Sequence, residues 1–94
     1  MPLTPRNLTR HELIGLEVKV AGSSHKGYVG ISGRIVDETR NMLVILSDGK
    51  FKRVPKKVST FHFKLPDGRR VEVEGWRIVG RPEDRVKKVL ARRW

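Results

Sequence analysis

Short stretches in which apolar and polar residues alternate follow one another along the chain, about ten residues apart. A period of two is typical of a β-strand with one buried face. Turn-forming sequences such as Asp48-Gly49 and Pro66-Asp67-Gly68 separate these stretches. The pattern predicts five or six short strands, at residues 16–20, 31–35, 42–46, 51–54, 61–65 and 71–73.

Strands with this spacing favour a small antiparallel sandwich or barrel, and closing the sheet would remove its exposed edges. Residues 42–46 are apolar without a break, which predicts the most central strand. Pro55 ends the stretch at 51–54, which we therefore place near an edge, because proline cannot donate a hydrogen bond to a neighbouring strand.

The period changes at both ends of the chain. Thr9 and Glu12 have the spacing of a capping box, which predicts a helix of one or two turns over 9–14. Pro82 fits the first position of a second helix, over 82–92. We expect three parts: a flexible N-terminal arm, a short helix followed by the β-barrel, and a basic C-terminal helix or tail, at residues 1–8, 9–80 and 81–94.

The composition indicates one small domain with a polyanionic partner. In 94 residues, 21 Lys and Arg outnumber 10 Asp and Glu, which gives a net charge of +11. No apolar run is long enough to span a membrane, no secretory leader is evident, and there is no cysteine. We therefore expect a cytoplasmic protein with no membrane partner, and nucleic acid as its polyanion.

The sequence does not suggest an enzyme that acts by itself. His11, His25 and His62 lack the spacing of metal ligands. Asp37-Glu38 is an acidic pair, but adjacent acids in a turn are more often solvated turn formers. The sequence contains neither a glycine-rich phosphate loop nor a nucleophile elbow. We expect no catalytic residue, no metal site and no cofactor bound by the protein.

The basic residues are concentrated between Asp48 and Asp67, a stretch without any acid. Like charges that repel one another are stabilised by a polyanion, through phosphate neutralisation and counterion release. A generic solvated face is the alternative. We predict that the phosphate contacts come from one set of side chains: Lys26, Arg34, Arg40, Lys50, Lys52, Arg53, Lys56 and Lys57.

The aromatic residues are expected mostly in the core. Phe61 and Phe63 alternate with polar residues, and Phe51 and Trp76 are assigned to the core as well. Tyr28 lies in a loop between strands, where it either stacks on a base or closes one end of the barrel.

Residues 37–41 form a polar connection between two predicted strands. Asp and Asn side chains bond to nearby backbone amides in turns. We expect Asp37, Glu38, Thr39 and Asn41 to shape this turn, with Arg40 pointing outward to the nucleic acid. Direct contact of the same four residues with nucleic acid is the alternative.

Three blocks of sequence stand out: HELIGL at 11–16, GISGRIVDETRN at 30–41 and RPEDRVKK at 81–88. In this order and spacing they resemble the archaeal ribonuclease P protein component 1 family. The resemblance runs from about residue 5 to residue 92. It implies a mainly β fold, a small Sm-like or SH3-like antiparallel barrel of about six strands with short N- and C-terminal helices.

The same resemblance implies an accessory subunit of a ribozyme that removes the 5′ leader from precursor tRNA. The ribonuclease P RNA and its magnesium ions would carry out the cleavage. Its implied partners are that RNA, a small zinc-ribbon subunit and the other ribonuclease P subunits. A basic ribosomal protein with a small barrel and an Sm-type ring protein are the alternatives. The number of copies in the native complex separates the three.

The two terminal helices are predicted to dock the protein partner. Their apolar residues would lie within a charged rim, as is usual for such surfaces. The expected anchors are Leu13, Ile14, Val86 and Leu90. The alternative is that both helices simply cap the ends of the barrel.

Overall fold

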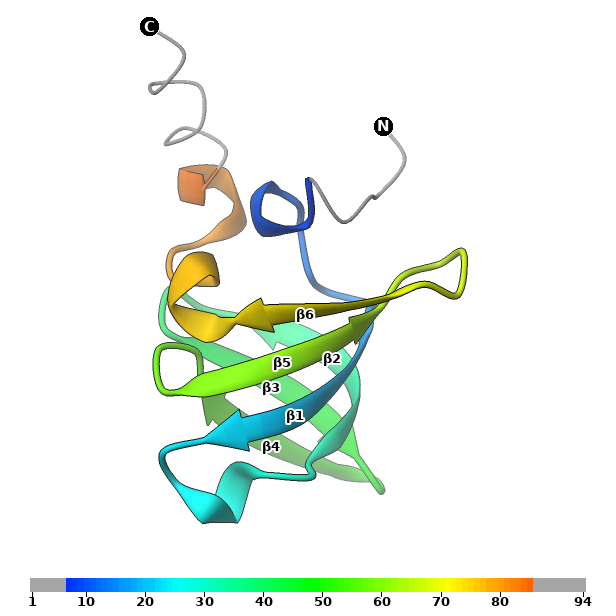
Figure 1. Cartoon of the computed structure of the whole chain (residues 1–94), viewed down its shortest axis with the longest axis vertical. Helices are drawn as coiled ribbons and strands as arrows, with labels where there is room; N and C mark the ends of the chain where they lie inside the picture. Colours follow the sequence, from blue (N-terminus) through cyan, green and yellow to red (C-terminus); the bar gives the residue numbers. More distant parts are fainter. Residues whose placement is uncertain (1–6, 86–94) are drawn as a thin grey trace, which may run out of the picture.

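The computed structural model of the chain describes residues 7–85, which form one bent antiparallel β-sheet with short 3-10 helices around it (Figure 1). The six strands are β1 (Glu17–Ser23), β2 (Ser32–Glu38), β3 (Met42–Ser47), β4 (Lys50–Pro55), β5 (Ser59–Lys64) and β6 (Arg70–Glu74). Each predicted strand overlaps one of them, so the mainly β fold class is confirmed.

The strand order is β4-β3-β2-β1-β5-β6. The sheet bends into a barrel-like shape, with β2, β3 and β4 behind β1 and β5 in the view of Figure 1. Its hydrogen-bonded ladder is open, because β4 and β6 are not paired with each other in the part of the chain that the structure describes. Strand β4 lies at an edge, as Pro55 predicts.

The prediction that 42–46 is the most central strand is wrong, because β3 lies next to the edge strand. Its inward residues Leu43 and Ile45 are buried, while Leu46 on the other face is exposed. The unbroken apolar run therefore reflects an aliphatic outer face rather than burial on both faces.

The bend of the sheet depends on local irregularities. The register shifts between Val20 and Gly22 in β1 and between Ile35 and Asp37 in β2, and such bulges increase strand bending. At Gly33 a Cβ atom would lie 2.0 Å from the backbone oxygen of Leu46. Only glycine allows β2 to approach β3 this closely.

One face of the sheet forms the hydrophobic core. Phe61 and Phe63 are fully buried, with ring centroids 6.0 Å apart, which confirms their predicted position. The other buried apolar residues come from the remaining five strands and from the segments before β1, after β5 and after β6: Leu8, Leu13, Val18, Val20, Ile35, Leu43, Ile45, Val54, Leu65, Val73 and Ile78.

Two aromatic residues that were expected in the core are exposed. Phe51 is 71% exposed, because it lies on the outer face of edge strand β4, opposite Leu46. Trp76 is 61% exposed, because the 3-10 helix η3 (Gly75–Ile78) turns Gly75 and Ile78 inward. A period of three leaves the two residues between them, Trp76 and Arg77, outside.

The helix predicted over 9–14 is replaced by the 3-10 helix η1 (Leu8–Arg10), in which Asn7 rather than Thr9 occupies the N-cap position. The backbone is already extended at His11. The carbonyl oxygen of Thr9, which an α-helix would use internally, accepts a hydrogen bond from Arg85 Nε at 2.7 Å. A tertiary contact has therefore displaced the local helical one.

At the other end, residues 82–85 are helical. The rest of the helix predicted over 82–92, and most of the arm predicted over 1–8, lie outside the described residues. None of the helices within residues 7–85 is long and apolar enough to cross a membrane.

Candidate nucleic-acid interface

The outer face of the sheet carries one continuous row of exposed side chains, one from each strand. In the order of the sheet these are Phe51, Leu46, Arg34, Glu17, Lys64 and Arg70. We call these six residues the exposed row. Each member is paired in register with the next, so their side chains lie side by side on one surface.

The basic half of the exposed row lines a surface depression of about 470 Å³. Arg34, Lys64 and Arg70 lie there with Lys19, against the single carboxylate of Glu17, whose Oε2 is 3.8 Å from Lys64 Nζ. His62 also lines the depression, and its Nε2 lies 2.8 Å from Glu72 Oε1. The surplus of cations suits this surface to phosphate groups.

Lys19, Lys64 and Arg70 were missing from the predicted contact set. Their signal was present in the sequence, because each occupies the outward position of an alternating strand. The predicted phosphate contacts were chosen where basic residues are dense in the sequence, which favoured residues 50–57 instead. Only the register of β1, β5 and β6 brings these three side chains together with Arg34.

Strand β4 provides a second basic surface. Lys50, Phe51, Lys52 and Arg53 are all exposed, which we call the edge-strand patch. Alternate residues point to opposite faces of a strand. All four are accessible because β4 has a neighbour on one side only within the described sheet.

The remaining predicted contacts are scattered. Lys26 lies in the 3-10 helix η2 (Lys26–Tyr28), before β2, and Arg40 lies in the turn after β2. They are therefore at opposite ends of one strand. Lys57 is exposed in the loop after β4. Tyr28 is half-buried and packs against the core, which favours its structural alternative over base stacking.

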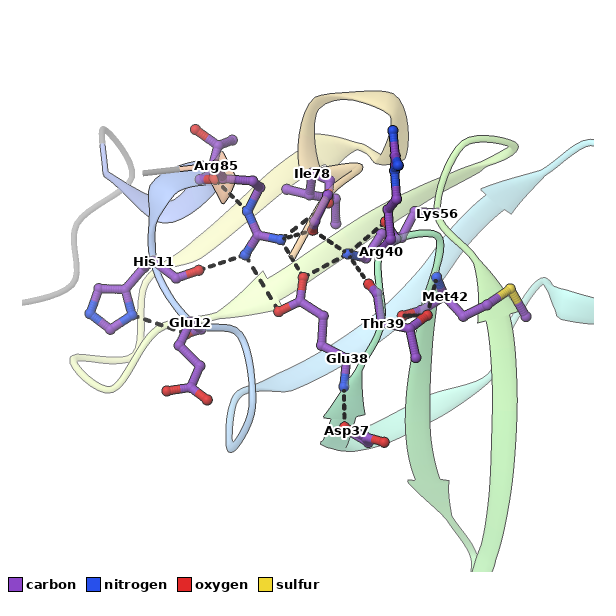
Figure 2. Close-up of polar contacts among 12 residues, drawn as sticks. His11, Glu12, Asp37, Glu38, Thr39, Arg40, Met42, Lys56, Ile78 and Arg85 are labelled. Atoms are coloured by element: carbon purple, nitrogen blue, oxygen red, sulfur yellow. Dashed lines mark hydrogen bonds and ion pairs between the residues drawn. The ribbon is translucent and has the colours of Figure 1, made fainter. Parts of the chain in front are cut away.

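Lys56 is not an exposed phosphate ligand, and its place in the predicted contact set is wrong. Its side chain is fully buried, and Nζ donates to Glu38 Oε2 at 2.7 Å. The same ammonium donates to the backbone oxygens of Thr39, at 2.7 Å, and Gly80, at 3.0 Å (Figure 2). A lysine with its hydrogen bonds used internally is unavailable to RNA.

Arg85 reaches the same carboxylate from the C-terminal side. Its guanidinium contacts both oxygens of Glu38, through Nη1 to Oε2 and through Nη2 to Oε1. We call Glu38, Lys56 and Arg85 the Glu38 cluster. One buried anion thus faces two buried cations, and no buried side-chain N or O atom in the described residues lacks a hydrogen-bond partner.

Burial lowers the pKa of Lys56 below its usual range. The hydrogen bond to Glu38 and the charge of its carboxylate act in the opposite direction, and the positive charge of Arg85 lowers the pKa further. Burial of Lys56 thus favours its neutral form, whereas its pairing with Glu38 favours the charged form.

Arg85 also joins the two ends of the described chain. Nε donates to Thr9 O and Nη2 donates to His11 O, each at 2.7 Å. Nη1 donates to Gly80 O at 2.7 Å and to Ile78 O at 3.2 Å. Figure 2 shows the guanidinium between the carbonyl group of His11 and the carboxylate of Glu38.

The turn after β2 is shaped partly as predicted. Thr39 Oγ1 accepts from the amide of Met42 at 3.1 Å, and Asp37 Oδ1 accepts from the amide of Glu38 at 2.8 Å. Asn41 contributes its backbone oxygen, which accepts from the amide of Lys56 at 2.8 Å. Glu38 is buried, so it is neither a solvated turn residue nor a residue that contacts RNA.

Among the described residues, no three His, Asp or Glu side chains gather into a group that could hold a metal ion. Asp37 and Glu38 point to different sides of β2, Asp37 outward and Glu38 into the cluster (Figure 2). The acidic pair of the sequence is therefore not a pair in space.

The predicted docking anchors divide into three groups. Leu13 is fully buried in the core, so its assignment as an anchor is wrong. Ile14 is 43% exposed and remains available to a partner. Val86 and Leu90 lie outside the described residues.

The fold and this surface define a small, basic, barrel-like β protein whose outer face suits a polyanion. Residues 6–88 match the model of the ribonuclease P/MRP subunit p29 family, and the chain belongs to that family.

Relatives support the assignment over most of the chain. Ribonuclease P protein component 1 of Methanothermobacter thermautotrophicus is 55% identical over 92% of this chain and 94% of its own length. The protein of the same name from Methanocaldococcus jannaschii is 48% identical over 94% and 93%. A solved structure described as Mth11, a homologue of human RNase P protein Rpp29, is 53% identical, with a TM-score of 0.59 over 79% of this chain and 96% of that one.

Proposed function

We propose that this chain is a protein subunit of ribonuclease P that binds the enzyme's RNA and assists it in removing the 5′ leader of precursor tRNA. The family assignment and the names of the relatives support the subunit role. Neither a ribosomal protein nor an Sm-type ring protein is favoured by any of these matches.

The observation that supports RNA binding most directly is the basic outer surface of the sheet. Arg34, Lys64 and Arg70 in the exposed row and the cations of the edge-strand patch lie on regular strands, at positions fixed by strand pairing. Because the backbone at these positions is already ordered, only side chains need to be ordered on binding, and the cations neutralise phosphates and release counterions. They would reduce repulsion between RNA segments that must pack together.

In this proposal the RNA and its magnesium ions cleave the phosphodiester bond, and the protein binds no metal. The protein partners are the small zinc-ribbon subunit and the other ribonuclease P subunits, with Ile14 as one contact. A cytoplasmic location is part of the same proposal.

Reconstitution tests the function. Ribonuclease P RNA is assembled with the other subunits, with or without this chain, and leader release is measured over a magnesium titration. We expect the chain to lower the magnesium concentration at half-maximal cleavage and to raise the rate. The variant with Lys52, Arg53 and Lys57 replaced by Ala should give a smaller effect while melting normally. An unchanged magnesium requirement and rate on addition of the wild-type chain would refute the proposal.

Partner docking is tested by hydrogen exchange on the intact chain. Amides near Ile14 should exchange more slowly when the zinc-ribbon subunit is added, and Ile14→Glu should abolish that change. Equal exchange with and without the partner would place the interface elsewhere.

A further inference from the structure

Phe51 is the most exposed large apolar side chain in the described residues, with 71% of its surface accessible. Its cross-strand partner Leu46 covers one side and is itself 37% exposed. A phenylalanine on an edge strand gains little from this position in the folded chain, because most of its apolar surface stays in water. The folded sheet therefore does not account for its aromatic character.

The surroundings of Phe51 are cationic. Lys50 and Lys52 flank it in sequence, Arg53 follows, and Arg34 lies beyond Leu46 in the exposed row. The edge-strand patch contains no acid, and the only carboxylate of the exposed row, Glu17, lies on β1, three strands away from β4. A ring among positive charges suits a partner that has both a flat π surface and negative charge.

We propose that Phe51 stacks on an unpaired nucleobase of the RNA, with Lys50, Lys52 and Arg53 contacting the adjacent phosphates. This inference rests on the proposed function and specifies the chemistry of one of its contacts. Base–aromatic stacking within a basic groove is the usual way in which proteins hold single-stranded nucleic acid.

Two other occupants fit the surface less well. Bases of an A-form duplex are stacked inside the helix, and its deep major groove does not admit side chains, so a duplex would touch only the cations. An apolar protein segment that covered Phe51 and Leu46 would also cover Arg53 and Arg34 on the same face, and it would leave these two cations without counter-charges, which is costly.

The position of β4 favours a strand-like ligand. It pairs only with β3 in the described sheet, so its other edge is open along the whole patch. An extended RNA segment can follow this edge, with one base against Phe51 and its backbone beside the lysines. One aromatic side chain is enough for this contact, because a single base stacks on Phe51.

Binding of two RNA probes to the full-length chain tests the inference. One probe is a fluorescent oligouridylate of roughly 12 nucleotides, a length within the usual site size, and the other is a blunt RNA duplex of similar length. Phe51→Ala should weaken oligouridylate binding about 5- to 160-fold. The slope of affinity against salt should stay the same, because no phosphate contact is lost. Affinity for the duplex should not change.

Three further variants complete the test. Phe51→Tyr should bind oligouridylate as the wild type does, whereas Phe51→Leu, which keeps the apolar surface without a π face, should lose affinity as Phe51→Ala does. Trp76→Ala removes another exposed aromatic residue, one whose Nε1 donates to Glu74 Oε2 at 2.6 Å, and should have no effect. Equal melting temperatures establish that the variants fold, as expected for exposed positions.

Wild-type affinity in Phe51→Leu, an equal loss of duplex binding, or unchanged oligouridylate binding in Phe51→Ala would each overturn the stacking contact. If the wild-type chain fails to bind oligouridylate but still binds ribonuclease P RNA, stacking is wrong and the proposed function stands. Failure to bind either RNA would overturn both.

Discussion

Lys56 and Glu38 form a fully buried ion pair, with Nζ 2.7 Å from Oε2, and Arg85 contacts the same carboxylate. Sequence proximity placed Lys56 with Lys52, Arg53 and Lys57 on the surface. The structure instead places it at the junction between the turn after β2, the end of β4 and the C-terminal segment. Its role is to hold these parts together.

Removing the shared carboxylate should strongly destabilise the protein. In Glu38→Gln, two buried cations would remain without a counter-charge, and such a change costs about 3–5 kcal/mol. We expect the melting temperature to fall by about 12 °C or more. Asp37→Asn is the matched control, because Asp37 is the exposed neighbour on the same strand. Similar melting of the two variants would show that the cluster contributes little.

Neighbouring lysines should have separable roles. Lys57→Ala removes an exposed charge and should leave melting unchanged. If Lys57 contacts a phosphate, the log–log salt slope of RNA binding should flatten by about 0.7–0.9. Lys56→Ala should lower the melting temperature and leave that slope unchanged when measured below the transition. Thermal melts and salt titrations of both variants check this. A flatter slope in folded Lys56→Ala would mean that this lysine reaches RNA after all.

The contribution of Lys56 to stability should rise as pH increases toward 10.5. Because burial lowers the pKa of Lys56 from its ordinary 10.5, the unfolded chain binds more protons than the folded one between the two pKa values. The free energy of unfolding therefore increases as pH rises through that window, and the penalty of the buried charge is fully present below it. Denaturant unfolding of the wild type and Lys56→Met is compared at several pH values below 10.5.

The difference between these two proteins isolates Lys56, because the other titrating groups are common to both. The stability of the wild type relative to Lys56→Met should increase with pH. A difference that is constant over the window, or that decreases, would contradict the lowered pKa.

The exposed row should contribute to RNA binding as a unit. Replacing Arg34, Lys64 and Arg70 together by Ala removes three cations and should flatten the salt slope by about 2–3 if each contacts a phosphate. The control is the double variant of Arg77 and Arg81, which are exposed but lie outside the sheet. Fluorescence titrations with ribonuclease P RNA over a range of salt concentrations measure both. If the salt slope flattens by the same amount per charge removed in both variants, RNA binding depends on the overall charge of the protein rather than on the exposed row.

The strands could be predicted because their signal is local. Alternation at Phe61 and Phe63 and the turn at Asp48-Gly49 define strand and hairpin within a few residues. The Glu38 cluster had no such signal, because its members are 18 and 47 positions apart and a buried lysine has the same local pattern as an exposed one.

The errors at Thr9 and Phe51 have related causes. The capping spacing at Thr9 was genuine, but Arg85, 76 positions away, binds the carbonyl that a helix would need. Phe51 was assigned to the core by its hydrophobicity, whereas its exposure depends on β4 being the last strand of the sheet. Long-range pairing decided both outcomes.

The contacts of Arg85 also affect how the chain folds during its synthesis. A ribosome makes the N-terminal end first, at about 5–20 residues per second, and domains begin to fold as they emerge. The carbonyl groups of Thr9 and His11 are made early, but the Arg85 guanidinium that binds them lies 76 and 74 positions further along the chain. A nascent chain that has already paired all six strands still lacks this link, so the segment around Thr9 and His11 becomes fixed only after residue 85 has left the ribosome.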